Sequence, residues 1–465
     1  MTGTFRYAAL VPVLVGWALM LLYLAGGFPP IVYNGQRFMS VLLLSACVLG
    51  GLLVALPRLG GPSRLLLLWL LMCALGATLL NGAHWFAWRE VALVVMVILA
   101  ARLLAALRLH IGTAFDRPAM QGVVLFSFGV SLIVLQSLLL YATTLPVLQW
   151  QLVFEAFFNV RYFSNVQGWT LLLLPAAIHA LKDQRGWHLL AWLAAALWWG
   201  LFYFSGSRSL LVAVLCGMLL CLWVFGPRHP WWRTVFLCAG AGLLVFLVIR
   251  GGLFLAGIEV TDSLEFTRDW WAAGGRWQIW AFVGQHAWQD LWTGPGNHLL
   301  ACTDAFGVNH EHNVVMTLLA GWGLPVTLVA VGLVLWLLWR FIQTVRTPLG
   351  STDWLAMSLV AMWGTVLTEA LFSSNYLNPI SHLLAALMLG WSWGIVASGS
   401  ITGHAQALAA RISLPVLLLS LIVLAAALFM IAVDIHMQET LIFPGDTIRM
   451  NFGPRVWAWG SDWCP

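Results

Sequence analysis

The residues best suited to chemistry stand at the end of one long polar interruption in an otherwise apolar chain, between Gly251 and Asn313. Ionisable groups are expensive in hydrocarbon, so a cluster of them at a membrane boundary predicts a functional site. A neutral imidazole accepts a proton from an attacking hydroxyl near pH 7, which makes His312 a candidate general base. His310, Glu311 and Asn313 are candidate supporting residues, and the alternative is that either histidine only caps the next helix or titrates without a function.

Three arginines in polar segments are candidates for binding phosphate. Arg208 follows an SGS turn that contains Ser207, and Arg276 follows two glycines in GGRWQIW, so in each case a guanidinium can act beside backbone N–H groups. Two such arginines suit a diphosphate, because each gives a bidentate pair of bonds that lysine cannot give. Arg161 in NVRYFSN is a third candidate. The alternatives are a membrane-interface anchor for Arg208 and a salt bridge from Arg161 to Glu155.

The composition predicts an all-α polytopic membrane protein that must position these residues. Of the 465 residues, 62% are hydrophobic and only 8% are charged, and the mean hydropathy is +0.91. A soluble domain carries about 25% charged residues, so a large globular protein is excluded. The pI of about 9.0 does not indicate a nucleic-acid partner, because no basic cluster interleaved with aromatic residues occurs.

Thirteen apolar runs predict 12 to 13 transmembrane helices in a single bundle over residues 1–433. They cover residues 8–26, 39–57, 64–80, 91–107, 119–140, 168–181, 187–204, 209–226, 233–257, 313–339, 352–372, 380–398 and 412–433. The run at 168–181 is short for a bilayer core of about 30 Å, so it begins earlier or tilts. The loop at 251–312 is rich in tryptophan and phenylalanine with few charges, which predicts interfacial helices in the plane of the membrane.

Positive charge predicts the orientation of the bundle. With a cytoplasmic N-terminus, 13 of the 22 Lys and Arg residues fall on the cytoplasmic side, mostly in short loops. An odd number of spans then places the two termini on opposite sides and leaves a periplasmic tail at 434–465. Four external segments converge on the periplasmic face, at residues 158–169, 204–209, 251–312 and 370–379.

Neither a metal site nor a cofactor is expected. The chain has no CxxC or HExxH spacing, and His310 with His312 alone is a weak metal signal without a carboxylate or thiolate at matching spacing. No DxD motif occurs, which agrees with arginines neutralising a phosphate. Cys302 and Cys464 lie in polar segments on one predicted side, so they either form a disulfide or stay free.

The motifs SGSR, then GGRWQIW followed by GPG, then HEHN followed by GWGLP occur in this order, separated by apolar spans, over roughly residues 155–395. This pattern resembles the O-antigen ligase superfamily, which includes O-linked protein oligosaccharyltransferases and, more distantly, O-antigen polymerases. The resemblance implies a GT-C-type glycosyltransferase of the bacterial inner membrane that takes a glycan from undecaprenyl diphosphate. It also implies that His312 is the catalytic base and that Arg208 and Arg276 hold the diphosphate.

The expected activity is a metal-independent, inverting transfer to the hydroxyl of a lipid A-core sugar or of a pilin serine or threonine, at the periplasmic face. The expected partners are the lipid-linked donor, one of these acceptors and membrane lipids. One alternative is a polymerase that extends the glycan on its own carrier. Another is a lipid-linked oligosaccharide flippase, which predicts charged residues deep within spans, whereas the charged residues here gather at one edge.

Overall fold

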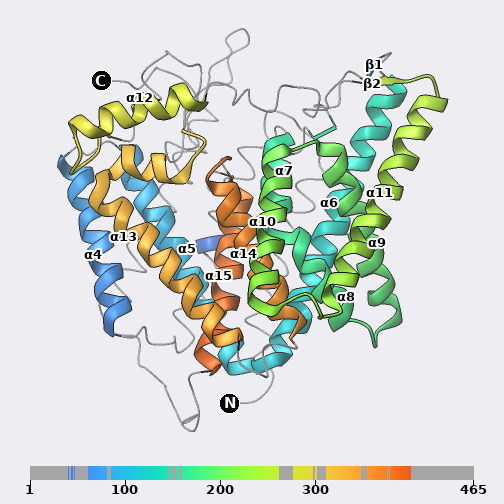
Figure 1. The fold of residues 1–465 in the computed structure, drawn as a ribbon, viewed down its shortest axis with the longest axis horizontal. Helices are drawn as coiled ribbons and strands as arrows, with labels where there is room; N and C mark the ends of the chain where they lie inside the picture. The colour runs from blue at the N-terminus through green and yellow to red at the C-terminus, as the bar shows by residue number, and fades with distance from the viewer. Residues whose placement is uncertain are drawn as a thin grey trace.

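The protein is a bundle of helices. The computed structural model describes residues 40, 43–45, 47, 61–80, 85–144, 147–148, 153–154, 157, 160–260, 276–296, 299–300, 311–346, 353–373, 375 and 378–399. The elements in chain order (Figure 1) are α4 (Gly61–Leu80), α5 (Trp85–Ile111), η1 (Gly112–Phe115), α6 (Asp116–Thr144), β1 (Val147–Leu148), α7 (Val160–Thr170), η3 (Leu171–Leu173), α8 (Leu174–Ala180), α9 (Arg185–Ser205), α10 (Arg208–Phe225), α11 (Trp231–Leu255), β2 (Glu259–Val260), α12 (Arg276–Gln289), α13 (Val314–Val345), α14 (Trp354–Ala370) and α15 (Pro379–Gly399). The predicted helical class is confirmed for this part of the chain.

A two-residue parallel strand pair is the exception within the described residues. Val147 of β1 pairs with Glu259 of β2, and Leu148 pairs with Val260. This pairing joins the end of α11 to the chain between α6 and α7.

The chain is a multi-pass membrane protein by the length and composition of its helices. Six described helical runs are long and apolar enough to cross a membrane: residues 90–144, 185–205, 208–225, 231–255, 314–345 and 379–398. The first contains 55 residues, which at about 1.5 Å per residue far exceeds a bilayer core of about 30 Å. It is divided into α5 and α6 at Gly112, whose φ of 71° is left-handed, and at the 3-10 turn η1.

Every apolar run predicted between residues 64 and 398 coincides with a helix or, at 168–181, with a broken helix. The runs at 8–26 and 412–433, most of 39–57, the tail at 434–465, and Cys302 and Cys464 lie outside the described residues. The number of spans, the placement of the termini and the state of that cysteine pair therefore remain predictions.

The short run at 168–181 is explained by a break. Its helix begins earlier, at Val160, and α7 gives way to the 3-10 turn η3 before α8 continues. Pro175 at the start of α8 has no N–H to donate to the preceding turn, and its ring crowds that turn. The polar first half, α7, is thereby separated from the apolar second half.

Glycines let neighbouring helices approach until their backbones touch. At the contact of α10 with α14, a Cβ on Gly217 would collide with the carbonyl oxygen of Ala361, and one on Gly364 would lie 2.8 Å from the Cα of Gly217. A Cβ on Gly390 of α15 would lie 2.5 Å from the carbonyl oxygen of Ala101 in α5. Small residues at such crossings are typical of membrane helices, where packing rather than water exclusion drives association.

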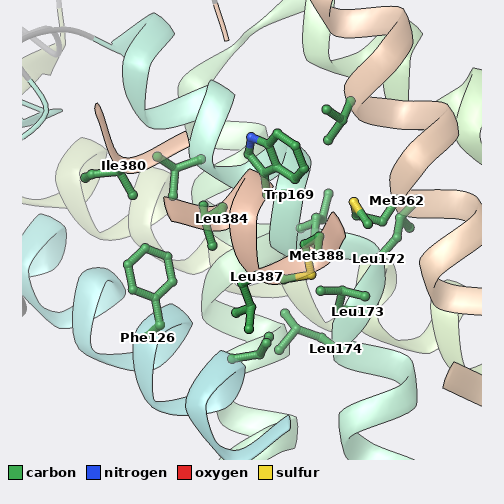
Figure 2. Packing of buried hydrophobic residues seen from close by; sticks show 14 of the residues in the cluster. Phe126, Trp169, Leu172, Leu173, Leu174, Met362, Ile380, Leu384, Leu387 and Met388 are labelled. Atoms are coloured by element: carbon green, nitrogen blue, oxygen red, sulfur yellow. The ribbon is translucent and has the colours of Figure 1, made fainter. Parts of the chain in front are cut away.

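The apolar core surrounds the broken helix. Figure 2 shows Leu172, Leu173 and Leu174 packed with Met362 of α14 and with residues of α15, among them Leu387 and Met388. These side chains are buried, so the break in the helix lies inside protein, where its irregular backbone is shielded from lipid.

Candidate functional site

His312 and Asn313 form the start of α13. The Oδ1 atom of Asn313 accepts hydrogen bonds from the backbone N–H groups of Val315 (2.9 Å) and Met316 (3.2 Å), so Asn313 is the N-cap. His312, directly before it, is 8% exposed and has a φ of 53°. It is the one non-glycine among the described residues with a positive φ. Such a backbone is uncommon outside glycine and costs free energy, which is typical of functional sites.

Glu311 secures the residues before the cap. Its side chain is fully buried, and Thr317 Oγ1 donates to its Oε2 at 2.6 Å. Its carbonyl oxygen accepts from Trp280 Nε1 of α12 at 2.8 Å. The sequence suggested Glu311 as a residue that orients His312. In the structure, these two hydrogen bonds of Glu311 link the first turn of α13 to α12.

The GWGLP motif is a break in α13 at which another segment docks. Gly323 has φ 76° and ψ 179°, so the helical ladder opens there. The N–H of Leu324 donates to the carbonyl oxygen of Leu291 at 2.9 Å instead of to Ala320. The freed carbonyl oxygen of Ala320 accepts from the N–H of Gly296 at 2.9 Å. These two backbone groups, released by the break, are therefore paired with the segment that follows α12.

The GPG motif is the docked segment. Gly294 has a φ of 74°, and a Cβ on it would lie 2.5 Å from the carbonyl oxygen of Ala320 and 2.8 Å from the nitrogen of Gly323. A Cβ on Gly323 would lie 2.5 Å from the carbonyl oxygen of Trp292. Both glycines are required because two backbones touch here. In consequence α12, which lies crosswise to α13 (Figure 1), is fixed relative to the start of α13.

The SGS turn before Arg208 has a structural reason of its own. Gly206 ends α9 in a left-handed conformation, with φ 61°. Ser207 is the N-cap of α10, and its Oγ accepts from the N–H of Leu210 at 3.5 Å. The turn is a helix end followed at once by a helix start. It is thus no separate argument for phosphate binding, and the case for Arg208 rests on its place at the first residue of α10.

All three predicted arginines stand in the first turn of a helix. Arg161 is the second residue of α7, Arg208 the first of α10 and Arg276 the first of α12. Arg161 is exposed, and the other two are partly buried. An anion bound at such an end would be favoured both by the guanidinium group and by the positive end of the helix dipole.

The starts of α10 and α13 lie at one end of the bundle, beside the end of α14. Gly217 of α10 contacts Gly364 of α14. Leu210 of α10 and Glu369 of α14 both lie beside Gly168, so α10 runs antiparallel to α14. The start of α10, with Arg208, therefore lies level with the end of α14. Asn313 ties the start of α13 to the same place, since its Nδ2 donates to the carbonyl oxygen of Leu371 at 3.0 Å.

Two of the four segments predicted to converge, 158–169 and 370–379, are joined by hydrogen bonds. Ser373 Oγ and the Asn165 side-chain amide lie 2.8 Å apart, and Asn378 Nδ2 donates to the carbonyl oxygen of Tyr162 at 3.0 Å.

The sequence interpretation missed Glu369, which is fully buried in the last turn of α14. Its signal was available: it is the one carboxylate among residues 354–372 of an apolar run, and such residues are expensive in a membrane. Glu369 lies at the end of α14, which is the end of the bundle where the candidate site residues also lie.

Two predicted features involve residues outside the described part of the chain. His310 and Glu155 are not described, so the supporting role of the first and the ion pair of the second with Arg161 remain predictions. Among the described residues, no group of three or more His, Cys, Asp or Glu is placed to hold a metal ion.

Comparison with known proteins adds no assignment. No protein-family model matches the chain, and no curated protein matches it.

Proposed function

We propose that the chain is a glycosyltransferase of the O-antigen ligase superfamily, which moves a glycan from undecaprenyl diphosphate to an acceptor hydroxyl at the periplasmic face of the bacterial inner membrane. The observation that carries the proposal is the arrangement at one end of the bundle: Arg161 and Arg208 begin helices beside the end of α14, where Asn313 of the His312–Asn313 pair is also bonded. Arg276 begins the helix that docks on α13.

In the proposed reaction, the arginines and helix N-termini hold the diphosphate. The acceptor oxygen forms a bond to the anomeric carbon while the bond from that carbon to the diphosphate oxygen breaks. The proton of the hydroxyl passes to His312, and the electron pair leaves with the diphosphate. Attack opposite the leaving group inverts the anomeric centre. The guanidinium groups neutralise the charge that develops on the diphosphate, so the step is proposed to need no metal.

The exposed surface of α12 supports a substrate that is embedded in lipid. Trp277 and Trp288 of α12, and Trp292 just after it, are 68%, 77% and 78% exposed. Tryptophan at such positions is typical of the boundary between hydrocarbon and water. A helix anchored there would keep Arg276 at the depth of a lipid diphosphate.

A transfer assay with three acceptors tests the proposal. The purified full chain in lipid nanodiscs is given undecaprenyl-diphosphate-linked glycan together with lipid A-core, a serine- and threonine-containing pilin peptide, or a second lipid-linked glycan. A glycosylated product with the first, second or third acceptor identifies a ligase, an oligosaccharyltransferase or a polymerase. The His312→Ala variant is the control for background transfer.

The flippase alternative has its own readout. In vesicles that contain the protein, a fluorescent lipid-linked glycan is followed across the bilayer. Movement of the glycan across the membrane, with no transfer to any of the three acceptors, would overturn the glycosyltransferase proposal.

A further inference from the structure

Glu369 is a buried carboxylate that the proposed reaction does not use. It lies in the last turn of α14 and is fully buried. Its Oε2 has no hydrogen-bond partner among the described residues. Gly168 of α7 faces it so closely that a Cβ there would collide with Oε2. Burying a carboxyl group with one oxygen unsatisfied costs stability, so its presence calls for a reason other than packing.

The other oxygen of this carboxyl group meets Asn165. With its amide nitrogen turned toward its neighbours, Asn165 is 3.1 Å from Glu369 Oε1, 2.8 Å from Ser373 Oγ and 3.1 Å from the carbonyl oxygen of Arg161. This orientation is the one in which the nitrogen faces acceptors. One buried amide therefore connects the first turn of α7 to the last turn of α14.

The end of α14 is in turn bonded to the start of α13. The N–H groups of Phe372 and Ser373 donate to the carbonyl oxygen of Glu369 at 2.9 and 2.7 Å, which closes the turn after the helix. Leu371, inside that turn, accepts from Asn313 Nδ2 at 3.0 Å. A continuous path of hydrogen bonds and short backbone steps thus runs from Arg161 to the residue next to His312.

We propose that Asn165, Glu369 and Ser373 form a buried clamp, in which Glu369 is a positioning residue that fixes the spacing between Arg161 and His312. The proposal rests on the proposed function for its consequence in catalysis, but the clamp itself is a statement about structure. Glu369 acts through the acceptor that it offers to Asn165. Misplacing a reacting group by about 1 Å lowers a rate about a hundredfold, so a loosened clamp lowers kcat more than it changes the KM for the donor.

The test compares four variants of the full-length protein. Glu369→Ala and Asn165→Ala remove the clamp, and Glu369→Gln keeps a carbonyl acceptor of the same shape. Ser358→Ala is the matched control, because it removes a buried hydrogen bond, to Trp231 Nε1 at 2.8 Å, near the opposite end of α14. Three quantities are measured: the thermal midpoint, kcat and KM for the donor, and the rate at which diethyl pyrocarbonate modifies His312, read by peptide mass spectrometry.

In Glu369→Ala and Asn165→Ala, kcat is expected to fall about a hundredfold and modification of His312 to become several times faster. Glu369→Gln should restore both quantities to near wild type. Ser358→Ala should lower the thermal midpoint and leave both quantities unchanged. If Glu369→Ala does not accumulate, Ser373→Ala removes one contact of Asn165 and should move the same quantities in the same direction.

Two results would overturn the clamp. The first is an unchanged modification rate and kcat in Glu369→Ala and Asn165→Ala despite a lower thermal midpoint, which would leave Glu369 with a packing role. The second is a Glu369→Gln variant as inactive as Glu369→Ala, which would mean that the carboxyl acts through its proton. If the wild type transfers no glycan, the proposed function fails, and the modification rates still decide whether the clamp exists.

Discussion

The segment after α12 is joined to the break in α13 by hydrogen bonds between backbone groups, whereas α7 is joined to the end of α14 by hydrogen bonds of side chains. The segment after α12 meets α13 through the N–H groups of Gly296 and Leu324, with Gly294 and Gly323 giving room. In the other region, α7 is joined to the end of α14 through the side-chain amide of Asn165.

The difference shows what each region tolerates. A backbone contact depends on the absence of side chains, so adding a single methyl group breaks it. A contact made by buried side chains depends on matched donors and acceptors, so a change of one functional group breaks it while its volume is kept. The two regions present different parts of the proposed site: His312 and Arg276 belong to the first, and Arg161 and Arg208 belong to the second.

The largest expected effect is that of His312→Ala. General base catalysis contributes about 10²- to 10⁴-fold, so transfer should fall by that factor while donor binding persists, because the arginines hold the donor. Transfer and binding of lipid-linked glycan are measured on the purified variant. His310→Ala is the comparison and should be milder. An active His312→Ala protein beside an inactive His310→Ala protein would move the base to His310, and normal transfer by both would end the acid–base proposal.

Gly323→Ala is expected to reduce transfer about a hundredfold, because it separates α12 from α13 and displaces Arg276 relative to His312. The φ of 76° with ψ of 179° is a conformation that only glycine occupies readily, and the strain for another residue is about 1–3 kcal/mol. Thermal unfolding and transfer are both measured.

Gly332→Ala is the matched control in the same helix. A Cβ on Gly332 meets no heavy atom within 4 Å, so this substitution should be neutral or slightly stabilising. Equal transfer by Gly323→Ala and Gly332→Ala would show that the docking of backbone on backbone does not align the site.

The two regions also differ in how much of their structure the sequence could predict. The GPG and GWGLP motifs are visible as glycine and proline patterns, and their order was sufficient to suggest a site, although not that the two motifs touch. The helices were predictable from apolar runs of the right length. The clamp was not, because Asn165 and Ser373 are far apart in the chain and look like ordinary polar loop residues until the helices are assembled. Glu369 alone gave a signal, as a carboxylate in an apolar run.

Arg208→Lys and Arg276→Lys each test one of the two regions, because each keeps the positive charge of the side chain but changes its shape. Lysine loses the bidentate fork on phosphate, and one lost charged hydrogen bond costs about 1.5–3 kcal/mol, or roughly tenfold to a hundredfold in transfer. Arg233→Lys is the control, since Arg233 is exposed near the start of α11, at the opposite end from β2. If both regions hold one diphosphate, both site variants lose activity; transfer within about twofold of wild type in both would make these arginines anchors.

The smallest expected effect comes from the hydrogen bond that joins the two regions, Asn313 Nδ2 to the carbonyl oxygen of Leu371. Asn313→Ser keeps an N-cap of similar strength but has no group that reaches Leu371, so it isolates this bond. A lost hydrogen bond costs about 1 kcal/mol, which predicts a loss of transfer of roughly fivefold. Asn313→Ala also removes the cap and should lower the thermal midpoint further. Unchanged transfer in Asn313→Ser would mean that α13 and α14 keep their relative placement without this bond, and the two regions would then be coupled through packing alone.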